Sequence, residues 1–237
     1  MDLYKLFSIP VLRYPADSST YDAIQIQLRD SIELMRSTDD KTCMSFSKPS
    51  SENIQKTYNF LEKYNCNLLE QRILQACKSY LEEIGWAAVA RTEDAIQIKN
   101  SWVNFTNTSE SRVAHVHPGY KISGVYYFRV SQKQGNIYFN NPNPLGMACE
   151  FPAGQIFPQT TDIVPDDGDI ILFPSWLIHG TRECKSEIER ISIAFNVDLN
   201  LVDERVQGLN KGSHVASHTT EYSMKGLLIN EIPSTTI

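Results

Sequence analysis

The chain has 237 residues, a formal net charge of -6 at pH 7, 41% hydrophobic and 21% charged residues, values typical of folded globular proteins rather than of disordered or fibrous ones. Lysine and arginine are scattered along the chain, which argues against a duplex nucleic acid or an anionic membrane as a partner. The longest apolar runs, such as Ile170 to Phe173, are far shorter than the roughly 20 residues that a membrane-spanning helix needs. We therefore expect a soluble protein that does not span a membrane.

The N-terminus and the cysteines predict the compartment. The first residues, MDLYKLFSIPVLRYP, lack a basic start followed by a long apolar stretch and a small-residue cleavage site, so we expect no signal peptide. The five cysteines are odd in number and have no Cys-x-x-Cys spacing, which is typical of free thiols in a reducing compartment. These features predict a cytoplasmic protein.

Two segments of the N-terminal part have a helical period. Apolar residues recur at steps of three and four from Tyr21 to Met35 and again from Leu68 to Ile84, which predicts two amphipathic helices that pack on a core. The stretch between them, from Ser37 to Lys56, is rich in Ser, Asp, Lys and Pro and shows no period, so it is interpreted as a loop or a lid.

After Gly85 the pattern changes to short apolar or alternating runs. They are separated by Gly, Pro, Asn and Asp and cover Ala95–Phe105, Ile122–Val130, Asn136–Asn140, Asp169–Phe173 and Ile191–Leu199. Such spacing favours an antiparallel sandwich or jelly roll over alternating β-α units. We predict a single domain over 1–237, with helical support in 1–90, a β core in 91–200 and a C-terminal extension in 201–237.

Three of the five histidines lie at the edges of expected strands. His115 and His117 are two residues apart, so in an extended segment they point to the same face and can converge on one point. His179 follows the expected strand and the Pro174-Ser175-Trp176 turn, which places it to add a third imidazole from across the fold. His214 and His218 in the tail are interpreted as solvated and are left out of the site.

Arg190 follows His179 in the segment Glu189-Arg190-Ile191-Ser192. Arg190 and Ser192 share one face of a strand. An arginine can hold a carboxylate through two parallel hydrogen bonds, with a hydroxyl completing the shell. An Arg-x-Ser pair in a strand is also common as a solvated edge, so the pattern alone leaves both interpretations open.

The order of several short motifs resembles a known superfamily. The motifs are His117-Pro118, Ser123-Gly124-Val125-Tyr126-Tyr127, Gly135-x-Ile137-x-Phe139, Gly168-Asp169-x-x-x-Phe173-Pro174-Ser175-Trp176-x-x-His179 and Arg190-x-Ser192-x-Ala194-Phe195-Asn196. As an ordered set, over about Trp102 to Val197, they resemble the 2-oxoglutarate- and iron(II)-dependent oxygenases, most closely a branch known largely from phage and marine bacteria. The resemblance implies a double-stranded β-helix core, cupin-like and mainly β, with packing helices at its N-terminus.

The resemblance also implies the metal ligands. In the superfamily a His-x-Asp/Glu pair and a distal histidine bind iron, and the first and distal positions correspond to His115 and His179. His117 occupies the position of the acid, which departs from the two-histidine, one-carboxylate triad. We favour three imidazole ligands; in the alternative, His117 is a ligand and His115 lies behind the ligands.

Other positions correspond to the co-substrate site. Arg190 corresponds to the basic residue that binds the distal carboxylate of 2-oxoglutarate, and Ser192 to its hydroxyl partner. Tyr127 falls where prolyl hydroxylases place a tyrosine that contacts 2-oxoglutarate, although only one of Tyr126 and Tyr127 can face the pocket. Trp102, Asn104 and Trp176 are candidates for the pocket wall.

These assignments predict an iron(II)- and 2-oxoglutarate-dependent dioxygenase. It would use molecular oxygen to hydroxylate a small molecule, an amino acid or a protein side chain, with release of succinate and CO2. Three imidazoles also suit zinc, so a zinc hydrolase is one alternative, and a metal-free jelly-roll binding or structural module is another. The substrate and the oligomeric state cannot be deduced from the sequence.

Overall fold

The computed structural model describes residues 8–45, 59–143 and 158–200. The chain up to Leu199 forms one compact unit, and a second unit covers Asn200–Ile237, of which only Asn200 is described. The single domain over 1–237 and the C-terminal extension therefore stay predictions. The predicted loop or lid is described only as far as Ser45, and its remainder lies outside the described residues.

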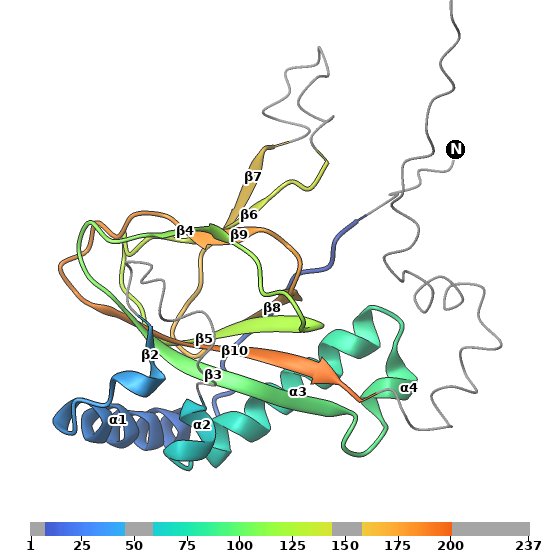
Figure 1. Ribbon diagram of the computed structural model, residues 1–237, viewed down its shortest axis with the longest axis horizontal. Coiled ribbons are helices and arrows are strands. Elements are labelled where there is room, and N and C mark those ends of the chain that lie inside the picture. The colour runs from blue at the N-terminus through green and yellow to red at the C-terminus, as the bar shows by residue number, and fades with distance from the viewer. Residues whose placement is uncertain (1–7, 46–58, 144–157, 201–237) are drawn as a thin grey trace, which may run out of the picture. The chain divides into compact units, whose positions relative to one another are not determined.

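Two β-sheets stacked face to face form the centre of the first unit (Figure 1). The larger sheet has the order β1-β8-β5-β10-β3-β2, with the strands β1 (Leu12–Tyr14), β2 (Met44–Ser45), β3 (Ile96–Thr106), β5 (Ile122–Arg129), β8 (Ile170–Pro174) and β10 (Arg190–Leu199). The smaller sheet has the order β4-β9-β6-β7, with β4 (Arg112–His115), β6 (Ile137–Asn140), β7 (Thr160–Ile163) and β9 (His179–Thr181). Among the described strands, every pair is antiparallel except β2 with β3. This is the predicted double-stranded β-helix.

Helices cover the outer face of the larger sheet, opposite the smaller sheet (Figure 1). They are α1 (Tyr21–Ser37), α2 (Phe60–Lys63), α3 (Asn67–Glu83) and α4 (Ala87–Ala90), with the 3-10 turn η1 (Lys41–Cys43) between α1 and β2. The helices α1 and α3 confirm the two predicted helices within one or two residues at each end. Their buried stripes follow the helical period, as in α1, where Ile24, Leu28, Ile32 and Met35 are buried. None of the helices in these ranges is long and apolar enough to cross a membrane.

Strand alternation assigns the two tyrosines of β5 to opposite faces of the larger sheet. Tyr126 faces the helices, because Gln25 of α1 donates a hydrogen bond to its hydroxyl. Tyr127 faces the smaller sheet and packs in an apolar cluster with Ile137, Phe139, Ile171, Phe173 and Leu177. This cluster fills one part of the space between the sheets, so Tyr127 is the tyrosine on the side of the predicted pocket.

The four longest strands and the four-residue β6 were predicted closely, and the other short strands were not. The predicted runs match β3, β5, β6, β8 and β10 to within one or two residues at each end. The strands β1, β4, β7 and β9 have only three or four residues, which is too short for an alternating pattern to stand out. Two of these unpredicted strands, β4 and β9, carry metal-ligand candidates.

Candidate metal centre

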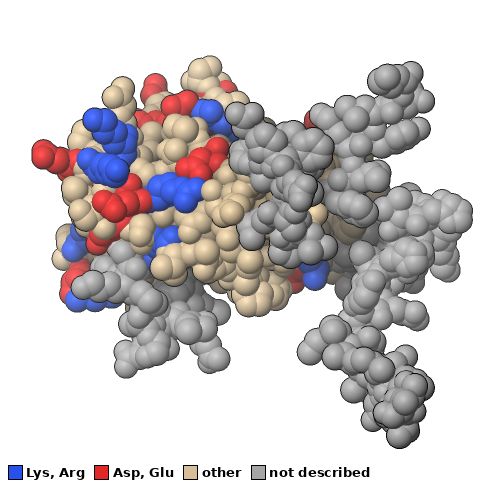
Figure 2. Space-filling view, turned by 90° about the horizontal axis from the view of Figure 1, so that it is seen from above, with Lys and Arg blue, Asp and Glu red and all other residues tan. Residues whose placement is uncertain are grey.

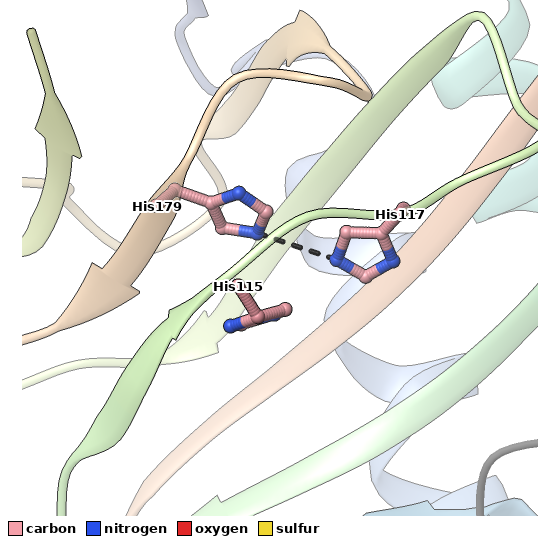
Figure 3. A group of neighbouring side chains, drawn as sticks. All are labelled: His115, His117 and His179. Carbon is pink, nitrogen blue, oxygen red and sulfur yellow. Dashed lines mark hydrogen bonds between the residues drawn. The ribbon is translucent and has the colours of Figure 1, made fainter. Parts of the chain in front are cut away.

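Three histidines from two segments of the chain come together at one end of the space between the sheets. His115 ends β4, His179 begins β9, and His117 lies in the loop after β4. One potential ligand atom of each lies within 4.8 Å of those of the other two. Figure 3 shows the rings of His117 and His179 with their Nε2 atoms turned toward one another, 3.3 Å apart. Two nitrogens bound about 2.1 Å from one metal ion at a right angle lie about 3.0 Å apart, so this spacing fits a shared metal ion.

Two of the imidazoles are oriented in the same way. The Nδ1 atom of His115 lies 2.8 Å from the carbonyl oxygen of Val113, and Nδ1 of His179 lies 2.8 Å from that of Leu177. In each ring Nδ1–H therefore donates to a carbonyl two residues earlier, and the lone pair of Nε2 is left for a metal ion. A hydrogen bond from the ring nitrogen that does not bind the metal is typical of metal-binding histidines. The hydrogen bond of His115 to Val113 favours His115 as a metal ligand over a role as a residue that only contacts the ligands.

The protonation states also suit metal binding. Burial, together with the neighbouring imidazoles, lowers the pKa of His117 to about 3 and that of His179 to about 4. Burial of its ring and the charge of Arg112 lower the pKa of His115, although this residue is the most exposed of the three. Because neutral imidazole is the form that binds metals, the three rings are ready to bind at neutral pH.

The local structure explains how the histidines meet. The sequence predicted that His115 and His117 converge by strand alternation, but β4 ends at His115. The loop then turns so that the backbone N–H of His117 donates to the carbonyl of Ser175 at 2.9 Å, which ties it to the turn before His179. Gly180 lets β4 approach β9 closely, because a Cβ there would lie 2.6 Å from the carbonyl oxygen of Arg112.

Arg190 lies between the two sheets and is only 2% exposed. Its Nη1 donates to the carbonyl oxygens of Gly135 at 2.6 Å and Gln134 at 3.3 Å. Its Nη2 donates to the hydroxyls of Thr106 at 3.1 Å and Thr181 at 3.4 Å. Its Nε has no hydrogen-bond partner within the described ranges.

No acidic group forms an ion pair with Arg190 in the part of the chain that the structure describes. Burial accordingly lowers the pKa of this guanidinium. A buried cation without a counter-charge lowers the stability of the folded protein. The free Nε and the two threonine hydroxyls thus offer donors for a carboxylate that would supply the missing charge.

Ser192 lies two residues after Arg190 on β10, and Tyr127 is its partner on the neighbouring strand β5. Both are buried, with 4% and 2% exposure, and they pair across β10 and β5. No hydrogen bond joins either side chain to Arg190 in the described structure, and burial raises the pKa of Tyr127 to about 12. Their contact with a co-substrate stays a prediction.

The three predicted wall residues differ in position. The ring of Trp102 stacks on that of His117, with centroids 5.7 Å apart. Asn104, two residues further along β3, pairs with Ser192 and accepts a hydrogen bond from Arg112. The Trp176 side chain, in contrast, is 57% exposed and no described contact joins it to the histidines.

Sequence reasoning missed several residues of the site. Thr106 and Thr181 bind Arg190 from opposite sheets, and Arg112 reaches the pocket from β4. Strand alternation could have predicted Thr106, because this residue lies two positions after Asn104 and therefore on the same face of the strand. Thr181 and Arg112 lie in short strands whose pairing no local pattern reveals.

Comparison with known proteins relates the segment that contains these residues to a known family. Residues 100–196 match the model of a family described as "Putative 2OG-Fe(II) oxygenase". The matched segment contains the three histidines and Arg190, so this part of the chain is similar to the 2-oxoglutarate- and iron(II)-dependent oxygenases. Iron(II) and 2-oxoglutarate, after which the family is named, are the cofactors of the class. No curated protein was found to match the sequence.

Solved structures show the same fold at low sequence identity. The α-ketoglutarate-dependent epimerase SnoN from nogalamycin biosynthesis is 11% identical, with a TM-score of 0.53 over 80% of this chain and 76% of that one. The apo form of the non-heme monooxygenase ThoJ is 10% identical, with a TM-score of 0.52 over 81% and 74%. The chain aligns with about half of an oxidoreductase of the 2OG-Fe(II) oxygenase family from Burkholderia pseudomallei, 48% of each chain at 16% identity and a TM-score of 0.36.

Proposed function

We propose that the protein is a dioxygenase in which His115, His117 and His179 bind iron(II) and Arg190 binds the distal carboxylate of 2-oxoglutarate. The observation that supports it best is Arg190 itself, a buried arginine with a free Nε and no acidic partner among the described residues. A zinc hydrolase has no need of such a group, and a metal-free binding module has no need of three converging imidazoles. A dicarboxylate that spans the metal and Arg190 accounts for both features.

Each residue has a defined part in this reaction. When bound, iron(II) and 2-oxoglutarate supply the activation of oxygen, with oxidation of 2-oxoglutarate to succinate and CO2 and hydroxylation of a C–H bond in the substrate. The histidines hold the metal through Nε2. Arg190 orients the co-substrate through Nε and Nη2, and the apolar cluster around Phe173, whose ring centroid lies 4.4 Å from that of His179, keeps water from one side of the site.

The substrate is proposed to be a small molecule, an amino acid or a protein side chain rather than a nucleic acid. On the face seen in Figure 2, Lys and Arg atoms lie next to Asp and Glu atoms, with no broad basic patch over the described surface in view. A nucleic acid would need such a patch. The cytoplasmic location is part of the same proposal, and the four cysteines in the described ranges are buried free thiols, which accords with it.

Titration of 2-oxoglutarate into anaerobic iron(II) protein tests the role of Arg190. The metal-to-ligand absorption band reports binding. Two charge-assisted hydrogen bonds are lost in Arg190→Gln, so we expect the affinity for 2-oxoglutarate to fall about 100-fold or more, and less in Arg190→Lys, which keeps the charge. Iron affinity should persist in both variants, which also reports that they fold.

Arg129→Gln is the matched control, because this arginine lies on the neighbouring strand β5, has a 44% exposed side chain and pairs with Glu189. Its affinity for 2-oxoglutarate should equal that of the wild type. Equal affinity in Arg190→Gln would instead show that another residue holds the carboxylate. Absence of the absorption band in the wild type would contradict the proposed function as a whole.

A further inference from the structure

A buried set of hydrogen-bonded side chains lies next to the metal centre. On β5 the hydroxyl of Ser123 donates to the side-chain oxygen of Asn196, the residue opposite it on β10, at 2.7 Å. The same hydroxyl is hydrogen-bonded to that of Ser175, the residue that follows β8, at 2.9 Å. All three side chains are buried, so the loss of one hydroxyl would leave its neighbours without a partner.

The main chain of Ser175 holds the loop that carries His117. Its carbonyl oxygen accepts a hydrogen bond from the N–H of His117 at 2.9 Å, and its own N–H donates to the carbonyl oxygen of Lys121 at 3.2 Å. One residue therefore binds both ends of the loop from 117 to 121. Ser175 also belongs to the turn between β8 and β9, the strand that begins with His179. It thus connects both histidine-bearing segments to the larger sheet.

His117 depends on its main chain more than the other two histidines do. Nδ1 of His115 and Nδ1 of His179 each lie 2.8 Å from a main-chain carbonyl oxygen. Within the described ranges no residue forms such a bond with Nδ1 of His117, whose ring stacks on that of Trp102. Stacking restricts the plane of a ring more than its position in that plane. The bond between the main chains of His117 and Ser175 therefore decides where Nε2 of His117 lies.

We propose that Ser123, Ser175 and Asn196 form a positioning network, which holds the loop so that Nε2 of His117 faces that of His179 (Figure 3). This inference rests on the proposed function, because it takes the histidines as iron ligands. The three residues act on the metal through the main chain of Ser175. Asn196 lies toward the opposite end of β10 from Arg190, so the network is separate from the group that binds 2-oxoglutarate.

Metal binding by variants without the hydroxyls tests the proposal. Ser175→Ala and Ser123→Ala each remove one hydroxyl and keep the main-chain bonds of Ser175. Loss of an outer partner of a ligand costs about 10- to 100-fold in metal affinity, and we expect about tenfold here, because the network acts through the main chain. Competition with a chromophoric chelator measures the iron(II) affinity.

The absorption spectrum of the cobalt(II) protein gives a second measurement on the same variants. It depends on the number and arrangement of the ligands, so a displaced His117 should change it in Ser175→Ala and in Ser123→Ala. A loss of folding stability alone would leave the spectrum of the folded protein unchanged. If Ser175→Ala does not fold, Ser123→Ala still provides both measurements, because it removes the same hydrogen bond.

Ser101→Ala is the matched control. Like Ser175, this serine is 0% exposed, and its hydroxyl accepts a hydrogen bond from the N–H of Leu61 at 2.9 Å. Because Leu61 belongs to α2, this bond lies on the helix-covered face of the larger sheet. Ser101→Ala should lower the unfolding temperature as the network variants do, but its iron affinity and cobalt spectrum should equal those of the wild type.

A double variant shows whether the two hydroxyls act as one unit. If they do, the combination of Ser123→Ala and Ser175→Ala should bind iron at most about twofold more weakly than the more impaired single variant. Independent effects would multiply to about 100-fold, and that result would overturn the network.

The other outcomes separate this inference from the proposed function. Wild-type iron affinity and an unchanged cobalt spectrum in both single variants would overturn the network and leave the proposed function intact. Equal losses in Ser101→Ala would also overturn it, because a general loss of packing would then be the cause. Wild-type protein that binds neither iron(II) nor cobalt(II) would contradict the proposed function and this inference together.

Discussion

At the scale of single residues, His117 is the unusual member of the site, because it stands where the resembled superfamily has an acid. Neutral imidazole in place of a carboxylate would leave a metal ion bound here with one more positive charge. The structure places this ring between Trp102, on which it stacks, and His179, whose Nε2 lies 3.3 Å from its own. The pKa of about 3 keeps it neutral well below pH 7.

Removal of His117 should therefore weaken the metal site. Loss of an outer partner of a ligand costs about 10- to 100-fold in metal affinity, so loss of the ligand itself in His117→Ala should cost at least as much. His117→Asp should recover part of the affinity, because a carboxylate is a common iron ligand. Competition with a chromophoric chelator measures the affinity of each variant.

The same measurement on His115→Ala decides between the two ligand sets. If both histidines are ligands, the two alanine variants should lose similar affinity. An unchanged iron affinity in His117→Ala would mean that the metal is held elsewhere. Trp102→Phe, which keeps an aromatic ring against His117, is the control and should bind iron as the wild type does.

At the scale of elements, the site depends on the close approach of β4 to β9. These strands pair with a register irregularity between Arg112 and His115, and His115 lies opposite His179. Gly180 is the residue that allows it, since a Cβ there would come within 2.6 Å of both the carbonyl oxygen of Arg112 and the hydroxyl of Tyr138. The end of a side chain can move more easily than a backbone carbonyl group. A Cβ at Gly180 would therefore force the strand β4 to shift.

Gly180→Ala should consequently damage the metal centre more than the fold. We expect iron affinity to fall about tenfold or more, because His115 would move out of position with β4. Thermal unfolding of the metal-free protein should change much less. Iron titration and calorimetry of the same preparation provide the two measurements.

Gly124→Ala is the matched comparison, because its Cβ would meet the side chains of Phe195 and Leu172 on the helix-covered face. This overpacking should cost about 1–3 kcal/mol of folding free energy, with iron affinity little changed in the folded fraction. If Gly180→Ala and Gly124→Ala changed iron affinity and thermal stability to the same extent, Gly180 would not have a specific role in positioning β4.

At the scale of the whole molecule, Asp40 joins the segment after α1 to α2. Its carboxylate accepts hydrogen bonds from the hydroxyls of Thr42 and Tyr64, both at 2.6 Å, and pairs with Lys63 at 2.7 Å. Burial would raise the pKa of this carboxyl, but the bonds from Lys63, Thr42 and Tyr64 outweigh it and hold the pKa well below its usual range. The side chain is only 10% exposed, so solvent screens these bonds weakly.

The lowered pKa of Asp40 predicts how stability depends on pH. A carboxyl with a lower pKa in the folded state stabilises the protein above the unfolded value of about 3.9, and this contribution is lost as pH falls through the folded pKa. Asp40→Asn should therefore lower the free energy of unfolding by about 1–3 kcal/mol at pH 7. The difference from the wild type should shrink below about pH 4, as measured by urea unfolding over pH 2 to 7.

Asp39→Asn serves as the control. Asp39 is 77% exposed and pairs only with the exposed Lys41 among the described residues, and asparagine tolerates its positive φ of 49°. Its effect should be about 0–1 kcal/mol at every pH. A difference for Asp40→Asn that stays constant from pH 7 to pH 2 would show that its stabilisation does not come from the charge.

Local patterns in the sequence determined the long elements and the outline of the site. The helical period placed α1 and α3, and strand alternation placed Arg190 and Ser192 on one face of their strand, because period and face depend only on neighbouring residues. The order of the motifs predicted the three histidines and the oxygenase class. The tertiary structure alone decided how β4 and β9 meet and which groups surround the arginines. Thr106 is 84 residues away from Arg190 and Arg112 is 69 residues away from Thr181, and only the pairing of strands in the two sheets brings such residues into contact.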